Sequence, residues 1–281
     1  MTMTLYREAL KEGTARLARA GIDTARLDCE VLISYACGIS RAKLLSRLNE
    51  KLPNKRYSLY LQYLGSREKR YPLSYITGHK EFMGLDFAVR EGILIPRPET
   101  ELLTESVMNM LSENANVIDL CTGSGAIAVS LAYYLYDAYI YATDISAAAC
   151  DVARLNAHRL SVDDRVNVLR GDLYKPLPEN LKADAIVGNP PYIKSSDMRG
   201  LMPEVQYEPD GALNGGKNGT DFYKRIIEGA PQYLKDGGFI ALEIGYDEAG
   251  DVEMLMGGEF ADIRVIKDMA GLDRVITGRL S

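Results

Sequence analysis

The chain has few of the residues that build metal sites and disulfide frameworks. Its 281 residues include four cysteines and two histidines, and no two cysteines are spaced as C-x-x-C. Because structural zinc sites and disulfide-stapled domains need clustered cysteine or histidine, we expect no metal and a reduced, cytoplasmic setting. The chain also lacks an apolar run of roughly 18 residues and the apolar core of a signal peptide, so no membrane partner is expected.

Positive charge is in short supply as well. The chain has 33 Lys and Arg against 39 Asp and Glu, a net charge of −6, and no tryptophan. Proteins that bind nucleic acid through its phosphates need a basic surface, so no direct nucleic-acid partner is expected. Two nucleotide-binding fingerprints are also missing. There is no G-x-x-x-x-G-K-[ST] loop, and Ala128 stands where the third glycine of G-x-G-x-x-G would be.

Three regions differ in pattern along the chain. Residues 1–72 contain short helical periodicities with capping residues, which predict a small helical bundle. Residues 73–95 contain an alternating segment around a glycine, which predicts a β-hairpin linker. Residues 96–281 alternate strands with helices, which predicts an α/β domain with a mostly parallel, seven-stranded sheet. Residues 260–267 and 273–280 break the alternation and are expected to add an antiparallel edge.

A glycine turn follows the first strand expected in the α/β region. Its residues are Cys121, Thr122, Gly123, Ser124 and Gly125, and a helix is expected to begin there. Glycines allow close approach of a ligand to the backbone, and a helix N-terminus offers free N–H donors. Asp144 ends the next expected strand, where a carboxylate can accept hydrogen bonds from ribose hydroxyls. Together these features predict a cofactor that contains a nucleoside.

The tetrapeptide Asn189-Pro190-Pro191-Tyr192 ends an apolar strand that starts near Asp184. Asn189 offers a side-chain carbonyl, and the two prolines have carbonyls but no N–H. The residue before a proline is extended, and Tyr192 adds an aromatic face. Such a pocket accepts hydrogen bonds from a flat group with an NH2, either a carboxamide or an exocyclic amine. The plain alternative is a turn after a buried strand.

Two further segments have weaker signals. Gly171-Asp172-Leu173 follows the third expected strand. Asp172 is an acceptor beside the apolar Leu173; the resemblance described next implies that the carboxylate accepts from an adenine amine while Leu173 packs on the ring, and a strand-ending turn is a serious alternative. The segment Leu213–Gly219 is rich in glycine and is expected to be mobile.

These motifs together resemble a known family. The spacing D-x-x-x-G-x-G from Asp119 to Gly125 resembles motif I of class I S-adenosylmethionine-dependent methyltransferases, which often carry another glycine where Cys121 stands. With IPRPETE at 95–101 and EPDGALNGG at 208–216, the chain resembles the HemK/PrmC family over nearly its whole length. The resemblance implies a Rossmann-like methyltransferase that methylates the glutamine N5 in the Gly-Gly-Gln motif of class 1 peptide chain release factors.

The resemblance also implies roles for residues. S-adenosylmethionine, or its product S-adenosylhomocysteine, would contact Cys121, Thr122, Gly123, Ser124, Gly125, Asp144, Asp172, Leu173 and Asn189. The acceptor amide would lie on Asn189, Pro190, Pro191 and Tyr192, and the helical bundle would dock the release factor. Arg97 and Glu99 either shape the pocket floor or simply begin a helix. A monomer is expected.

The expected chemistry needs positioning rather than a strong base. The Asn189 side-chain oxygen and the Pro190 carbonyl would accept the two N–H groups, so that the nitrogen lone pair faces the methyl donor. Two alternatives stay open. A nucleic-acid amine methyltransferase could use the same tetrapeptide, although the acidic composition argues against it. A retired methyltransferase fold could bind the cofactor without turnover, although both motifs are intact.

Overall fold

The computed structural model describes residues 4–112 and 114–281. Internal contacts divide the chain into two units. The first unit comprises the chain up to Gly78 together with Met202–Tyr207, and the second comprises His79–Leu201 and Glu208–Ser281. The domain boundaries expected from the sequence alone, after residues 72 and 95, stay a prediction.

The first unit is a helical bundle. Its helices are α1 (Tyr6–Arg19), α2 (Ala25–Cys37), α3 (Arg41–Ser46), α4 (Asn54–Glu68) and α5 (Leu73–Thr77). Gly38 ends α2 in the left-handed conformation, and the Ser40 hydroxyl caps α3 by accepting from the Lys43 N–H at 3.2 Å. Gly38 and Ser40 therefore mark helix ends, whereas α2 begins after Thr24, whose side chain makes no capping hydrogen bond. The five-residue helix α5 after Pro72 was not anticipated.

The segment Met202–Tyr207 belongs to this bundle although it lies far along the chain. Glu204 forms ion pairs with Arg67 at 2.9 Å and with Arg70 at 2.7 Å. Arg67 also pairs with buried Asp28 at 2.7 Å. The carboxylates on both sides of Arg67 compensate its desolvation. This ionic chain holds the segment, which includes the short 3₁₀ helix Val205–Tyr207, on the bundle.

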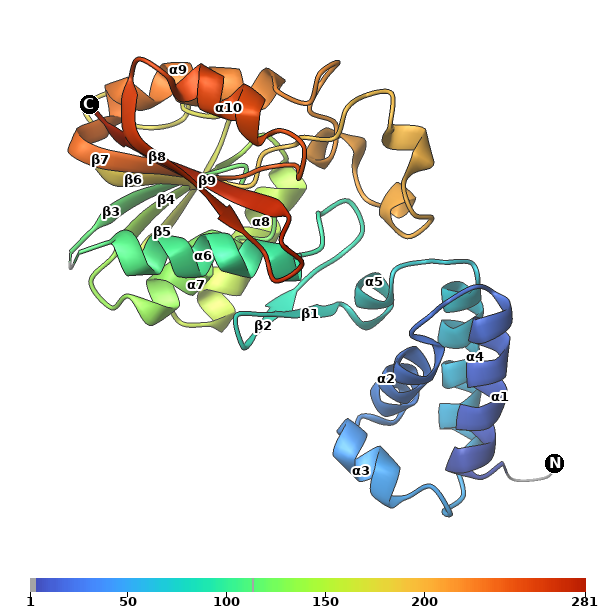
Figure 1. Ribbon diagram of the computed structural model, residues 1–281. Coiled ribbons are helices and arrows are strands. Elements are labelled where there is room, and N and C mark those ends of the chain that lie inside the picture. Colours follow the sequence, from blue (N-terminus) through green and yellow to red (C-terminus); the bar gives the residue numbers. More distant parts are fainter. Residues whose placement is uncertain (1–3, 113) are drawn as a thin grey trace. The chain divides into compact units, whose positions relative to one another are not determined.

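The second unit contains a hairpin and a seven-stranded sheet (Figure 1). The hairpin pairs β1 (His79–Phe82) with β2 (Leu85–Ala88). The sheet strands are β3 (Asn116–Leu120), β4 (Tyr139–Asp144), β5 (Val166–Arg170), β6 (Ala183–Gly188), β7 (Leu234–Glu243), β8 (Phe260–Lys267) and β9 (Asp273–Leu280). Their order is β5-β4-β3-β6-β7-β9-β8, with β9 antiparallel to both β7 and β8. The predicted fold class, including the antiparallel edge, is confirmed.

Helices cover both faces of the sheet (Figure 1). On one face lie α6 (Pro98–Met110), α7 (Ala126–Tyr134) and α8 (Ala147–Arg159), and on the other lie α9 (Asp221–Tyr233) and α10 (Ala249–Met256). Two further 3₁₀ turns, Met198–Gly200 and Asp210–Ala212, flank Val205–Tyr207 between β6 and α9. No helix of the described residues has the length and apolar character needed to cross a bilayer.

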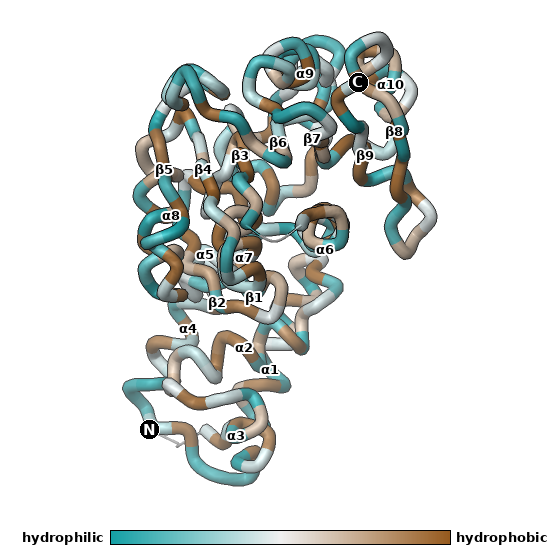
Figure 2. Tube along the Cα trace, turned by 90° about the vertical axis from the view of Figure 1, so that its left-hand side faces the viewer, coloured by the Kyte–Doolittle hydropathy of each residue, from teal (hydrophilic) through white to brown (hydrophobic). Residues whose placement is uncertain are grey.

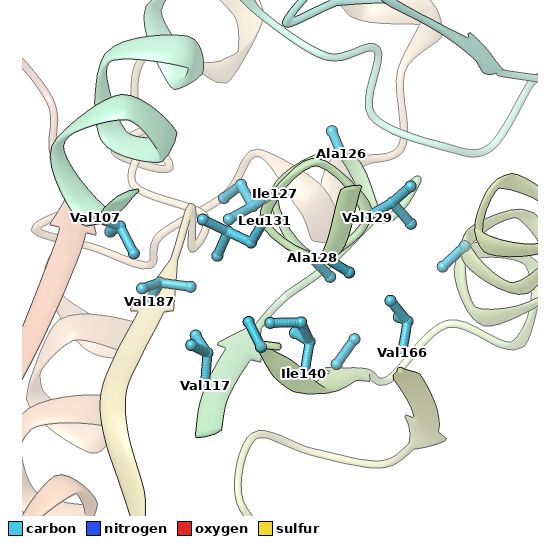
Figure 3. Packing of buried hydrophobic residues seen from close by; sticks show 14 of the residues in the cluster. Val107, Val117, Ala126, Ile127, Ala128, Val129, Leu131, Ile140, Val166 and Val187 are labelled. Atoms are coloured by element: carbon cyan, nitrogen blue, oxygen red, sulfur yellow. The ribbon is translucent and has the colours of Figure 1, made fainter. Parts of the chain in front are cut away.

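The helix after the glycine turn is buried along residues 126–132, whereas Tyr133 and Tyr134 at its end are exposed. Figure 3 shows Ile127, Val129 and Leu131 of α7 among side chains of α6 and the sheet, including Val107 and Val187. In Figure 2, α7 is drawn largely in the hydrophobic colour, whereas α8 alternates along its length. Burial of residues 126–132 anchors the glycine turn that precedes α7, because a helical segment that is apolar on most sides is stable only in a core.

Candidate active site

Strand register sets three residues in a row at the carboxyl edge of the sheet. Leu120 of β3 pairs with Gly188 of β6, and Gly188 pairs with Leu242 of β7. The next residue on each strand is Cys121, Asn189 and Glu243, respectively. The chain order reverses between β3 and β6, which is the switch point where open α/β sheets bind ligands. The glycine turn and the Asn-Pro-Pro-Tyr tetrapeptide therefore lie side by side.

The glycine turn depends on unusual backbone angles. Cys121, Gly123 and Gly125 have φ values of 61°, 56° and 80°. Glycine adopts this left-handed region without strain, whereas a side chain makes it costly. Glycine would therefore adopt the Cys121 conformation at a lower cost. A Cβ on Gly125 would also lie 3.0 Å from the Cβ of Ala153, so glycine permits close packing of α7 on α8.

Asp144 stabilises the turn from the neighbouring strand. Its carboxylate accepts from the N–H of Gly123 at 2.9 Å and from the N–H of Ser146 at 2.8 Å. Burial raises the pKa of this carboxyl, and the backbone N–H groups oppose that rise. The geometry holds an acceptor beside the glycine turn, as the sequence predicted.

A cavity of about 340 Å³ opens beside these groups, within the range of small-ligand pockets. Of the predicted cofactor residues, it is lined by Cys121, Gly123, Asp144, Asp172, Leu173 and Asn189. Thr122 and Ser124 are buried and, like Gly125 at the N-terminus of α7, do not line the cavity. Further lining residues were not anticipated: Gly92, Ile93, Leu94, Pro209, Gly211, Ala212, Phe222 and Arg225.

The Asp172 carboxylate already has partners. It accepts from Arg225 at 2.6 Å and from Lys175 at 2.8 Å. These two cations, with Arg225 first, lower the pKa of Asp172. Leu173 beside it is buried, with φ of 51°. Sequence reasoning missed the ion pair with Arg225 because the two residues are 53 positions apart.

The tetrapeptide is held at the opposite side of the crevice. Pro190 and Pro191 are buried, and Asn189 and Tyr192 are half-buried. A Cβ on Gly188 would lie 2.6 Å from the carbonyl oxygen of Leu120, so glycine allows the two strands to approach closely just before Asn189. Among the described residues, neither the Asn189 Oδ1 nor the Pro190 carbonyl accepts a hydrogen bond. Both oxygens are therefore without a partner among these residues, and of the two residues only Asn189 lines the cavity.

The glycine-rich segment after residue 212 supports the tetrapeptide. The N–H of Ile193 donates to the carbonyl of Leu213 at 2.9 Å, and the N–H of Gly215 donates to the carbonyl of Ile193 at 2.9 Å. A Cβ on Gly215 would lie 2.6 Å from the Cα of Tyr192. The glycines of this segment therefore serve close backbone packing, and the expected mobility stays a prediction.

Two buried residues behind the tetrapeptide were missed. The Thr100 hydroxyl of α6 donates to Glu243 Oε2 at 2.6 Å and accepts from Asn189 Nδ2 at 3.1 Å. The Tyr192 hydroxyl donates to Glu243 Oε1 at 3.3 Å. Burial raises the pKa of Glu243 to about 7. The available signal was a lone carboxylate inside the apolar run of β7, because an unpaired charge rarely lies in a core.

Arg97 and Glu99 begin α6. The Arg97 guanidinium pairs with buried Glu208, whose other oxygen accepts from the Ile95 N–H at 3.0 Å. This joins the IPRPETE and EPDGALNGG segments to each other. Glu99 lies exposed in the first helical turn, where an acidic side chain interacts favourably with the positive end of the helix dipole. Neither residue lines the cavity.

Comparison with known proteins agrees with this geometry. Residues 8–78 match the model of the PrmC N-terminal domain, and residues 98–203 match that of the methyltransferase small domain. The release factor glutamine methyltransferase of Moorella thermoacetica is 46% identical over 97% of both chains. The enzyme of that name from Clostridium acetobutylicum is 42% identical over 89% of both. The chain belongs to the release factor glutamine methyltransferase family.

Solved structures agree on the fold. A methyltransferase from Pyrococcus furiosus has a TM-score of 0.55 and 20% identity, covering 70% of this chain and 89% of that one. A 16S rRNA methyltransferase of T. thermophilus has a TM-score of 0.53 and 18% identity, covering 72% of this chain and 50% of that one. At these identities the likeness concerns the methyltransferase fold alone.

Proposed function

We propose that this chain transfers a methyl group from S-adenosylmethionine to the side-chain amide nitrogen (N5) of the glutamine in the Gly-Gly-Gln motif of class 1 peptide chain release factors. The observation that carries the proposal is the position of Asn189 beside the glycine turn, with Nδ2 bonded to Thr100 and Oδ1 available. A primary amide has two N–H donors and needs such acceptors. The names of the relatives supply the kind of protein that carries the amide.

The residues on the cofactor side fit S-adenosylmethionine. The cavity volume, the left-handed turn and the Asp144 carboxylate suit a nucleoside with an attached amino acid. We assign the ribose hydroxyls to Asp144 and the amino acid portion to the turn at 121–125. The adenine is assigned to the wall formed by Asp172 and Leu173. When bound, the cofactor supplies a methyl group on a sulfonium and leaves as S-adenosylhomocysteine.

The acceptor residues would act by orientation. Asn189 Oδ1 and the Pro190 carbonyl would accept the two N–H groups of the glutamine amide, while Tyr192 and Pro191 hold its flat face. An amide nitrogen is a weak nucleophile because its lone pair is delocalised, and two acceptors favour the pyramidal geometry that frees the lone pair. The N–C bond forms as the S–C bond breaks, and one proton then leaves the nitrogen for solvent. No strong base is required.

We assign docking of the release factor to the helical bundle, predicted as residues 1–72. The match of residues 8–78 to a domain model specific to PrmC proteins supports this assignment, because general methyltransferases do not need that domain for transfer. The excess of acidic residues supports a protein partner over nucleic acid. We further propose that the protein acts as a monomer in the cytoplasm.

The test is a methylation assay on the full chain. The protein is incubated with methyl-labelled S-adenosylmethionine and an unmethylated release factor, and the digested release factor is examined by peptide mass spectrometry. We expect one added methyl group on the glutamine of Gly-Gly-Gln. Label in DNA or RNA instead would establish a nucleic-acid enzyme. Cofactor binding without label in any release factor would indicate a retired fold, and either result overturns the proposal.

A further inference from the structure

The carboxylate of Glu243 lies at the end of a short hydrogen-bond chain that reaches Asn189. Glu243 is 1% exposed, and the hydroxyl of Thr100, 4% exposed, lies between the two. The three residues come from β7, α6 and the loop after β6. Strand register brings Glu243 and Asn189 to the same level of the sheet, since Leu242 pairs with Gly188. Neither Thr100 nor Glu243 lines the cavity assigned to the cofactor.

The direction of the chain follows from counting protons. An ionised carboxylate can only accept, and a hydroxyl has a single proton. The Thr100 proton therefore goes to Glu243, at an oxygen–oxygen distance of 2.6 Å. The Thr100 oxygen can then only accept a hydrogen bond, so the Asn189 group that lies 3.1 Å from it must be the NH2. An asparagine amide can be turned end for end in its site, and the network alone selects the orientation.

We infer that Glu243 and Thr100 are positioning residues that fix which end of the Asn189 amide faces the acceptor substrate. With the NH2 turned toward Thr100, Oδ1 faces outward as an acceptor. In the opposite orientation, Asn189 would present donors to the two donors of the substrate amide, and the amide would not be held in the reactive orientation. This inference rests on the proposed function, because it assigns a role in binding the glutamine NH2. Tyr192 shares the same carboxylate, so one group orients two parts of the acceptor site.

Protonation of Glu243 would remove this selection. A neutral carboxyl can donate to Thr100, whose proton is then free to bond Asn189 Oδ1, so the amide can rotate. The groups around Glu243 are Glu99 and Thr100 of α6, Tyr192 after β6, Arg274 of β9 and Tyr223 of α9 with Glu248 behind it. Arg274 favours the ionised form but is itself paired with Asp268 at 3.1 Å. Burial outweighs these contacts and raises the pKa of Glu243 to about 7.

The first test removes the hydroxyl. Thr100→Val keeps the shape of the side chain and is expected to lower kcat roughly 10- to 100-fold, the scale on which small misplacement slows a reaction. Thr100→Ser restores the hydroxyl and is expected to restore most of the activity. The matched control is Thr104→Val, one turn further along α6. The Thr104 hydroxyl is equally buried but bonds only the Thr100 carbonyl, at 3.1 Å.

The second test is the pH profile of kcat. Because the ionised form orients Asn189, kcat of the wild type should fall as the pH drops through about 7. Asp119 is also buried with a pKa raised to about 7, so the profile alone does not identify the group. Glu243→Gln cannot ionise and should show a lower kcat without that decline. A decline that persists in Glu243→Gln would assign it to another group and overturn this part of the inference.

The outcomes separate the inference from the proposed function. If the wild type does not methylate a release factor, the proposed function fails and no variant is needed. If the wild type is active and Thr100→Val keeps full kcat, the positioning role is wrong. Affinity for S-adenosylmethionine, measured by calorimetry, is expected to change little in all variants. If Thr100→Val does not fold, as judged by its thermal transition, the comparison of Glu243→Gln with the wild type decides the inference.

Discussion

On the cofactor side of the crevice, Cys121, Gly123 and Gly125 shape the pocket through backbone angles. On the acceptor side, Asn189 depends on the side chains of Thr100 and Glu243. The first side is determined by neighbours in sequence, and the second by residues 54 and 89 positions away from Asn189. The two sides should therefore respond differently to substitution: the cofactor side to changes in backbone freedom, and the acceptor side to loss of single polar atoms.

The largest effect is expected on the acceptor side. Asn189→Ala removes the side-chain acceptor and should lower kcat about 100- to 1,000-fold, as removal of one transition-state hydrogen-bond partner does in other enzymes. Asn189 also borders the cavity, but its loss should leave affinity for S-adenosylmethionine largely intact. Turnover and calorimetry on the same sample measure both. The control is Asn109→Ala, an exposed residue of α6, and survival of turnover in Asn189→Ala would refute the acceptor role.

A smaller effect is expected on the cofactor side, where the affinity for the cofactor should fall and kcat should not. Asp144→Ala removes the carboxylate assigned to the ribose and frees the N–H of Gly123. Affinity for S-adenosylmethionine should fall about 10- to 100-fold, the value of charge-assisted hydrogen bonds. At saturating cofactor, kcat should stay close to wild type. Asp151→Ala, whose side chain is 66% exposed on α8, is the control, and unchanged affinity in Asp144→Ala would contradict the assignment.

The smallest effect is expected at Cys121. Burial raises the pKa of its thiol, so the group is neutral and contributes no charge. Cys121→Gly removes the strain of about 1–2 kcal/mol that a side chain causes in the left-handed conformation. Glycine also makes the unfolded chain more flexible, which opposes this gain in stability. Thermal stability and cofactor affinity should change little, whereas Cys121→Val should destabilise the turn. Equal stability of the glycine and valine variants, measured by thermal unfolding, would show that the backbone angle does not matter.

Much of the fold followed from local patterns. The apolar segments of β3, β6 and β7 and the intervening helices are recognisable because a buried parallel sheet leaves a continuous signal. The closing strands Phe260–Lys267 and Asp273–Leu280 have the predicted bounds. Helix α5 escaped because five residues after Pro72 are too short for a periodicity to register.

The site was only half predictable. The glycine turn and Asp144 are encoded within one strand–turn–helix unit and its neighbour, so spacing sufficed. The partners of Asn189 are not encoded in such a local unit. Thr100 and Glu243 are 143 positions apart and meet only through strand register and the packing of α6. The same reason hid the pairing of Asp172 with Arg225. Gly215 and Gly219 were interpreted as a sign of mobility. Glycine occurs both in mobile loops and where backbones pack closely, and the structure shows close packing at these two positions.

A double-mutant cycle on kcat/KM for S-adenosylmethionine tests the separation of the two sides most directly. It compares the wild type, Asn189→Ala, Asp144→Ala and the double variant with a release factor as acceptor. Independent sites are predicted to give losses that multiply within about a factor of two. A double variant no worse than Asn189→Ala alone would contradict the account, because the turn and the tetrapeptide would then act as one unit.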